Sequence, residues 1–292
     1  MSAAIKTCQP PDPNPRTPAT KLPPGACDAH CHVFGPANVF PYAPDRSYTP
    51  PDAPVADLRR LHGILGVERA VIVQASCHGT DNAAALDAIA SSNGAYRGVA
   101  IVDGNVTDRE LDALNAGGIR GVRFNFVKHL GGTPDLDVFD SVLGRIERLG
   151  WHVVLHLDAG DILEHAARIE RIRVPFVIDH MGRVQAKNGV EQEPFRRLLD
   201  LMRNPLAWVK ICGPERVSSA GAPFRDAAPF AAALAEAAPD RTLWGTDFPH
   251  PNIAGDMPND GDLVDLLAAA VPDEAARHRI LVDNPTRLYW AD

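Results

Sequence analysis

The sequence predicts an α/β fold in which eight parallel strands alternate with helices and close into a (β/α)8 barrel, the TIM barrel. Short apolar runs recur at regular intervals along the 292 residues. Amphipathic segments of helical period separate these runs, and no glycine-rich nucleotide-binding loop follows any of them. A doubly wound open sheet is the alternative, but eight regular units over this length favour a closed barrel.

Residues 1–25 precede the first apolar run and predict an extended arm. The segment is rich in proline, which supports neither a helix nor a central strand. It also lacks the apolar core of a signal peptide. We expect this arm to be solvated or draped over the body, and residues 26–292 to form one barrel domain.

The barrel strands are expected at eight apolar runs, each short enough to cross a barrel once. In the first run, "ACDAHCHV", alternation places His30 and His32 on one face and turns Cys31 outward against the helices. In chain order, the runs cover residues 26–33, 69–74, 97–102, 119–124, 151–157, 174–179, 206–211 and 241–246.

Amphipathic segments between the runs predict the helices. Residues 81–93 form one such segment, opened by the capping residue Asp81, and residues 135–149 form another. Of the remaining histidines, we expect His62, His165 and His278 to lie in helical segments at the surface.

Composition excludes several classes of function. The formal net charge is −8, and no basic run exists to neutralise phosphates, which argues against nucleic-acid binding. No stretch approaches the length of about 20 apolar residues that a membrane span needs. The five cysteines are odd in number, widely spaced and without a C-x-x-C pair, which favours reduced thiols in a cytoplasmic protein. We expect a monomer or small homo-oligomer that acts on a small molecule.

Polar residues gather at the carboxyl ends of the predicted strands, where barrel enzymes build their active sites. Most of the histidines lie at or near these ends, with His152 the doubtful case. In chain order, the residues are His30, His32, Gln74, Ser76, Cys77, His78, Arg123, Asn125, Lys128, His129, His156, Asp158, Asp179, His180, Lys210, Arg216, Asp247 and His250.

Four histidines and one aspartate of this set have the chemistry of a metal site for hydrolysis. They are His30, His32, His156, His180 and Asp247. Neutral imidazoles bind a cation such as Zn²⁺, and a carboxylate can ligate it or take a proton from water. The same residues can also work as acid and base groups without a metal, so occupancy by zinc is a separate question.

Six motifs give the chain a resemblance to a known family. They are "DAHCHVFGP", "VIVQASCHGTDN", "GVRFNFVKHL", "VIDHMGR", "ICGPERVSSAGAP" and "WGTDFPHPN". Together they resemble the amidohydrolase superfamily, and within it the lactonases acting on 2-pyrone-4,6-dicarboxylate and 4-sulfomuconolactone. The resemblance spans residues 26–290 in the right order.

The resemblance implies a role for each matching position. His30, His32 and His180 would surround the lactone carbonyl, and Asp247 would activate the attacking water. The residues that would hold the anionic groups of the substrate are Ser76, His78, Arg123, Lys128, His129, Arg216 and His250, with Arg183 a weaker candidate. Cys77 needs no nucleophilic role beside Asp247.

Two positions depart from the pyrone-dicarboxylate lactonases. These resembled enzymes carry a tyrosine where this chain has His156, and an arginine where it has His129, and they are held to need no metal. With His156, the chain has the full set of metal ligands of the resembled superfamily. With His129 in place of an arginine, it lacks one permanent positive charge among the substrate-binding residues. Both departures favour a zinc-dependent hydrolase that converts 4-sulfomuconolactone to maleylacetate and sulfite.

Three other hypotheses stay open at this point. The first is metal-independent hydrolysis of 2-pyrone-4,6-dicarboxylate on the same fold. The second is a metal-dependent decarboxylase of the same superfamily. The third is a binding protein without catalysis, which would not need a proton-transfer aspartate among clustered histidines.

Overall fold

An eight-stranded, all-parallel sheet forms the centre of the molecule in the computed structural model, which describes residues 5–253 and 255–291. Each strand pairs with the next barrel strand along the chain, in the order β10-β9-β8-β7-β6-β5-β4-β2. The strands are β2 (Cys27–Cys31), β4 (Arg69–Val73), β5 (Tyr96–Ala100), β6 (Ile119–Asn125), β7 (His152–His156), β8 (Phe176–Ile178), β9 (Ala207–Lys210) and β10 (Thr242–Leu243).

Backbone hydrogen bonds between the first and last strands close the sheet. The amide of Ala29 donates to the carbonyl of Trp244, and the amide of His32 donates to that of Phe248, both at 2.8 Å. In return, the amide of Asp247 donates to the carbonyl of His30 at 2.8 Å. The barrel prediction is therefore confirmed, and the open sheet is wrong.

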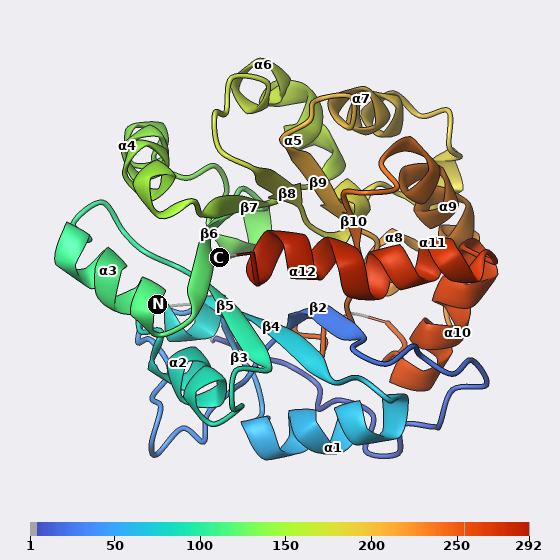
Figure 1. Cartoon of the computed structure of the whole chain (residues 1–292), viewed down its shortest axis with the longest axis horizontal. Coiled ribbons are helices and arrows are strands. Elements are labelled where there is room, and N and C mark those ends of the chain that lie inside the picture. The colour runs from blue at the N-terminus through green and yellow to red at the C-terminus, as the bar shows by residue number, and fades with distance from the viewer. Residues whose placement is uncertain (1–4, 254, 292) are drawn as a thin grey trace.

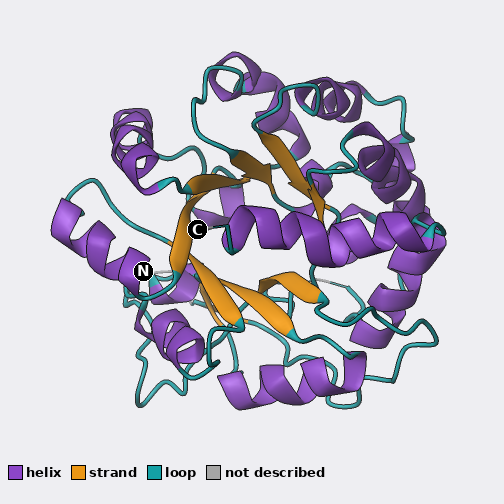
Figure 2. Cartoon of the chain, in the orientation of Figure 1, coloured by secondary structure: helices purple, strands orange, loops and turns teal. Residues whose placement is uncertain are grey.

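Helices surround this barrel on the outside, as Figures 1 and 2 show. They are α1 (Val55–Leu65), α2 (Ala83–Ala90), α3 (Asp108–Ala116), α4 (Leu136–Ile146), α5 (Ala159–Glu164), α6 (Ala166–Ile169), α7 (Glu193–Leu201), α8 (Pro214–Val217), α9 (Ala228–Ala237), α10 (Asp260–Ala270), α11 (Glu274–His278) and α12 (Asn284–Tyr289).

Side-chain alternation along the strands divides the core into two layers. In β7, Val154 faces the lumen, whereas Val153 and Leu155 belong to the larger layer between sheet and helices. Cys31 lies in that outer layer, as predicted, and its thiol donates to the carbonyl of Val71. The lumen below the site is filled by small and branched residues, so the barrel is packed rather than hollow.

The amino-terminal end of the barrel is closed by α12, which crosses it in Figure 1. Tyr289 of this helix joins the lumen core, and its ring lies 5.0 Å from the ring of His152. His152 begins β7 and is therefore at the end opposite the strand carboxyl termini, which excludes it from a site there.

Every predicted strand overlaps an observed one, although all the observed strands except β6 are shorter than the predicted runs. Helix α4 begins after Asp135, whose side chain accepts from the amides of Asp137 and Val138. Asp81 similarly accepts from the amide of Ala83, the first residue of α2. Asp135 thus caps α4, whereas the N-cap of α2 is Asn82 rather than the predicted Asp81, and its side chain makes no capping hydrogen bond.

The described part of the arm lies against the barrel. It contains the short strand β1 (Lys6–Thr7), which pairs in parallel with β3 (Tyr48–Thr49). Cys8 and Leu22 are buried. The division at residue 25 stays a prediction. No helix in the described part of the chain is long and apolar enough to span a membrane.

Candidate active site

A cavity lies at the carboxyl ends of the barrel strands, where the sequence predicted the active site. Its volume is about 20 Å³, roughly the room that one ordered water needs, so the side chains close tightly around it. Its lining residues come from strand ends and from the loops that follow them, and they include most of the predicted site residues. They are His32, Tyr48, Ser76, Arg123, His129, Leu130, His156, His180, Arg216, Asp247, Pro251 and Asn252.

Three imidazoles converge on one carboxylate oxygen in this cavity. The Nε2 atoms of His30, His32 and His180 lie 3.5, 3.3 and 3.9 Å from Oδ1 of Asp247. His30 and His32 come from the end of β2, His180 follows β8, and Asp247 follows β10. Since the backbone of Asp247 also pairs with His30, closure of the barrel brings the carboxylate to the histidines.

The other ring nitrogen of each histidine has its own partner. Nδ1 of His32 lies 2.8 Å from the carbonyl of Val73, which can only accept, so Nε2 of neutral His32 carries a lone pair. Nδ1 of His30 lies 3.2 Å from Asp179, and Nδ1 of His180 lies 3.3 Å from the sulfur of Cys212. These contacts hold the rings with Nε2 toward Asp247.

The spacing of His30, His32 and Asp247 suits ligands of one metal ion, with His180 farther away at 3.9 Å. Ligand bonds of about 2.0–2.1 Å to zinc place neighbouring ligand atoms about 3.3–3.4 Å apart, close to the distances from Asp247 to His30 and His32. Nε2 of His30 is buried without a hydrogen-bond partner among the described residues. His30, His32 and Asp247 form one group able to hold an ion, and His30, Asp179 and His180 form an adjoining one.

The charges of the site favour neutral imidazoles beside an ionised carboxylate. Burial lowers the pKa of His30 to about 4, and it holds the pKa of His180 well below its usual value. Burial alone would raise the pKa of Asp247. The charge of Arg216, with His180 and His32, overcomes this and holds that pKa well below its usual value. At neutral pH, the site therefore offers uncharged imidazole nitrogens as ligands and an ionised carboxylate as proton acceptor.

Beside these histidines lies a buried group of charged residues, of which only Arg123 had a role predicted from the sequence. Asp179 lies 3.3 Å from Nζ of Lys210 and 3.1 Å from Nε of Arg123, and all three side chains are almost completely buried. Lys210 also lies 3.1 Å from Nδ1 of His30. The available signal was the position of Asp179 and Lys210 at the ends of buried apolar runs.

Arg216 was predicted to hold the substrate, but here it binds the predicted base. Its Nε and Nη2 atoms donate to Oδ2 of Asp247 at 2.8 and 2.5 Å, and Nη2 also donates to the carbonyl of Pro251. The guanidinium lines the cavity at the same time. It therefore orients the carboxylate and presents positive charge to the cavity.

His156 lies in the wall of the cavity and outside the convergent set. Its Nδ1 lies 3.0 Å from Oδ1 of Asn125, whose amide nitrogen donates to the hydroxyl of Ser76 at 3.3 Å. Its Nε2 is buried without a hydrogen-bond partner in the described chain. Its ring lies 5.4 Å from that of His180 and 6.1 Å from that of His129. No described metal-capable group includes His156.

Three predicted substrate-binding residues lie outside the cavity lining. His78 contacts the amide of Gly35 and the carbonyl of Pro41, so it holds a neighbouring loop. Lys128 is exposed. His250 is buried; burial would lower its pKa, but Asp260 and Glu215 raise it to about 10. These partners make His250 a fixed cation behind the site.

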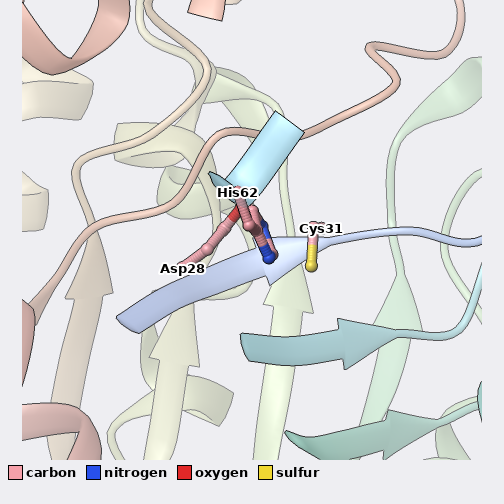
Figure 3. A group of neighbouring side chains, drawn as sticks. All are labelled: Asp28, Cys31 and His62. Atoms are coloured by element: carbon pink, nitrogen blue, oxygen red, sulfur yellow. The ribbon is translucent and has the colours of Figure 1, made fainter. Parts of the chain in front are cut away.

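A second polar group lies outside the barrel, between β2 and α1. Figure 3 shows Asp28 and Cys31 on the strand with His62 from the helix beside them. Nε2 of His62 lies 3.2 Å from Asp28, and His62 is buried, so its prediction as a surface residue is wrong. Asp28 also accepts from the amide of His30 and from Thr246.

This outer group has the atoms of a metal site but is already engaged. Both oxygens of Asp28 accept hydrogen bonds from the first and last strands, so the residue joins the seam of the barrel next to His30 and Asp247. Of the other two predicted surface histidines, His165 is also buried, because it packs against Phe126, whereas His278 is exposed as predicted.

Backbone strain concentrates around the site. Most of the described non-glycine residues in the left-handed region flank the cavity. They include His180 (φ 51°), Asp247 (φ 67°), His250 (φ 58°) and Asn252 (φ 63°). Such conformations cost about 1–3 kcal/mol each. Their clustering indicates that the surrounding fold holds these side chains in place for a function.

A parallel barrel with convergent histidines and an aspartate at its carboxyl end is the arrangement of a barrel hydrolase. The chain belongs to the amidohydrolase family, whose pattern matches residues 27–290.

Comparison with known proteins shows which members of the family this chain is similar to. The chain is 48% identical to a 2-pyrone-4,6-dicarboxylate hydrolase of Comamonas testosteroni, over 96% of this chain and 94% of the relative. It is 44% identical to a 4-sulfomuconolactone hydrolase of Rhizobium radiobacter, over 98% and 97%. Among solved structures, the chain is similar to a protein of Acinetobacter baumannii that is named as a probable 2-pyrone-4,6-dicarboxylic acid hydrolase with citric acid bound. The TM-score is 0.82 at 28% sequence identity, and the match covers 91% of this chain and 100% of the other.

Proposed function

We propose that the protein hydrolyses a small, unsaturated, anionic lactone, and that 4-sulfomuconolactone is its substrate. The observation that carries this proposal is the convergence of His30, His32 and His180 on Asp247 inside a cavity that also holds arginine side chains. The 44% identity to a 4-sulfomuconolactone hydrolase supports the same activity.

Asp247 is the proposed proton acceptor. Its carboxylate is ionised at neutral pH and lies among the imidazoles, so it can take a proton from water as the oxygen attacks the lactone carbonyl. The ring C–O bond then breaks, and the proton passes to the departing oxygen. For 4-sulfomuconolactone, the opened product then expels sulfite and leaves maleylacetate.

Zinc is the proposed cofactor, held by His30, His32, His180 and Asp247. When bound, zinc polarises a carbonyl and lowers the pKa of water. His32 offers a lone pair at Nε2, because its Nδ1 faces a carbonyl. His156 then serves as a cavity hydrogen-bond donor or acceptor rather than as a ligand, since none of the described groups of closely spaced ligand atoms includes it.

Cationic side chains in the cavity are the proposed binding groups for the sulfonate and carboxylate. Arg123 and Arg216 line the cavity together with Ser76 and His129. Because the whole chain carries a net charge of −8, recognition of an anion depends on such local positive charge. His78, Lys128 and His250 then act from outside the lining, through the loop, the surface and the fixed charge that they provide.

The test is to incubate the purified protein with 4-sulfomuconolactone and to measure sulfite. We expect stoichiometric sulfite and maleylacetate. Absence of sulfite, together with rapid turnover of 2-pyrone-4,6-dicarboxylate, contradicts the proposed substrate. Zinc content is measured on the same sample, and activity is followed through chelation and zinc addition.

Metal-independent hydrolysis of 2-pyrone-4,6-dicarboxylate is the second candidate. The 48% identity to a hydrolase of that compound favours it, as does the citric acid bound in a similar structure. In this case, His30, His32 and His180 polarise the carbonyl directly, and Asp247 is the base. Full activity on this pyrone after complete metal removal would establish it.

We also propose a cytoplasmic protein that is a monomer or a small homo-oligomer. All five cysteines are free and buried, as expected in a reducing compartment. Light scattering of the purified protein gives the oligomeric state, and fractionation of the source cells gives the location.

A further inference from the structure

The strap, defined here as residues 5–16 of the arm, contacts two segments that line the active-site cavity, at Tyr48 and at Asn252. Lys6 and Thr7 pair in parallel with Tyr48 and Thr49, and the amide of Cys8 donates to the carbonyl of Thr49 at 2.9 Å. Tyr48 is buried and lines the cavity. The strap therefore supports one wall of the cavity directly from behind.

Cys8 links this wall to the opposite one. Its thiol lies 3.6 Å from Oδ1 of Asn252, and the amide of Asn252 donates to the sulfur at 3.4 Å. Cys8 is only 7% exposed. Asn252 also lines the cavity and follows the strand end that carries Asp247. One strap residue thus contacts both β3 and the loop after the last strand.

The far end of the strap is fixed to the other end of the same loop. The side chain of Asn259 donates to Asp12 at 2.8 Å and accepts from the amide of Arg16 at 3.0 Å. Arg16 forms ion pairs with Asp262 and Asp265 on α10 at 2.5 and 2.6 Å. The strap therefore binds the loop at both of its ends, near Asn252 and at Asn259.

The strap also carries a cation to the cavity mouth. Lys6 is exposed, and burial, Arg183, Arg216 and Lys6 all lower the pKa of His129, which falls to about 4. The backbone of Lys6 pairs with that of Tyr48, which places this cation beside a residue of the cavity lining. An anionic ligand that enters beside His129 meets this charge first.

We propose that the strap forms part of the wall of the substrate pocket. It holds Tyr48 against the loop that contains Asn252, a contact called the clamp below, and it presents Lys6 to the anionic substrate. The anionic class of the ligand rests on the proposed function, whereas the contact of the strap with Tyr48 and Asn252 does not depend on that function. A strap with only a structural role would affect unfolding without changing substrate affinity.

Lys6→Gln tests the charge. We expect KM to rise about threefold with kcat unchanged, and the difference to vanish at high salt, as for an exposed ionic contact. The control is Lys21→Gln, which removes the same charge from an exposed arm residue beside Gly63 and Glu68, away from the cavity lining. Equal KM values for the two variants would overturn the role of Lys6.

Deletion of residues 2–10 tests the clamp and keeps the Asp12 and Arg16 anchor. We expect KM to rise about tenfold, and the amides of Asn252 and Ile253 to exchange with deuterium at least about tenfold faster, because the loop loses its contact with Cys8. Unchanged loop exchange would overturn the clamp.

A ligand that cannot react separates this proposal from the proposed function. Benzene-1,3-dicarboxylate is a planar dianion without a lactone bond, and its binding is measured by calorimetry for the same variants. If the wild-type protein hydrolyses neither lactone, the proposed function fails. Faster loop exchange in the deletion variant then still supports the clamp, and unchanged exchange still refutes it.

Discussion

His152 and His156 stand at the two ends of one strand, β7, and both are buried. Their side chains face the same lumen, as does Val154 between them. At the carboxyl end, His156 is held by Asn125 and lines the cavity. At the amino end, His152 packs edge-on against Tyr289, and neither ring nitrogen has a hydrogen-bond partner among the described residues.

The comparison shows that position along the strand, rather than residue type or burial, separates a histidine of the candidate site from a core one. Burial lowers the pKa of His152 to about 3, and that of His156 falls well below its usual value for the same first reason. A shifted pKa therefore does not distinguish them. What differs is the surroundings. His152 packs against Tyr289 in the apolar core, whereas His156 lies beside the polar residues of the cavity.

The largest effect is expected from Asp247→Asn at the carboxyl end. The amide keeps the shape and removes the proton acceptor, so kcat should fall about 10³-fold. Steady-state turnover of the lactone measures it, and circular dichroism confirms the fold. Retention of more than a tenth of wild-type kcat would contradict the assignment.

His156→Leu sharpens the comparison within β7. We expect kcat/KM to fall about 10- to 100-fold, because a polar group of the cavity wall is lost, while zinc content stays as in wild type. His32→Ala is the matched variant and should lose zinc. Loss of zinc in His156→Leu would make His156 a ligand. His156→Tyr should retain more activity than His156→Leu, and a gain on the pyrone would support the second candidate function.

The pH dependence of the free energy of unfolding provides a test that is specific to His152. Because its pKa is about 3 when folded and about 6.5 when unfolded, the unfolded chain binds more protons below pH 6.5, and stability falls as the pH drops. The share of His152 at pH 5 is about 2 kcal/mol. Urea unfolding of His152→Leu should therefore show a smaller loss between pH 7 and pH 5 than wild type. Parallel pH profiles would refute this.

The smallest effect is expected from His152→Leu at neutral pH. Replacing a buried ring without hydrogen bonds by an apolar side chain changes the free energy of unfolding by about 1 kcal/mol or less in either direction. Turnover should stay within about twofold of wild type. A large loss of kcat would show that the apolar core at the amino end communicates with the site, and would break the comparison.

Much of the site was predictable because its residues follow buried strands directly. His30, His32, His180 and Asp247 each lie at such an end, and the parallel barrel brings all ends to one face. The predicted contacts of Arg216 were less accurate, since sequence does not show that its guanidinium reaches Asp247. His62 was misplaced because only the tertiary fold supplies its buried partner, Asp28.

The sequence by itself determined the alternation of strands and helices, the face of each strand and the residues at its end, because these follow from local periodicity and chain order. Only the tertiary structure decided which of those residues meet. The distances from three Nε2 atoms to one oxygen, the buried charges around Asp179 and the strap over the cavity depend on how the barrel closes. That closure joins residues more than 200 positions apart, such as Asp28 and Thr246, and no local pattern encodes it.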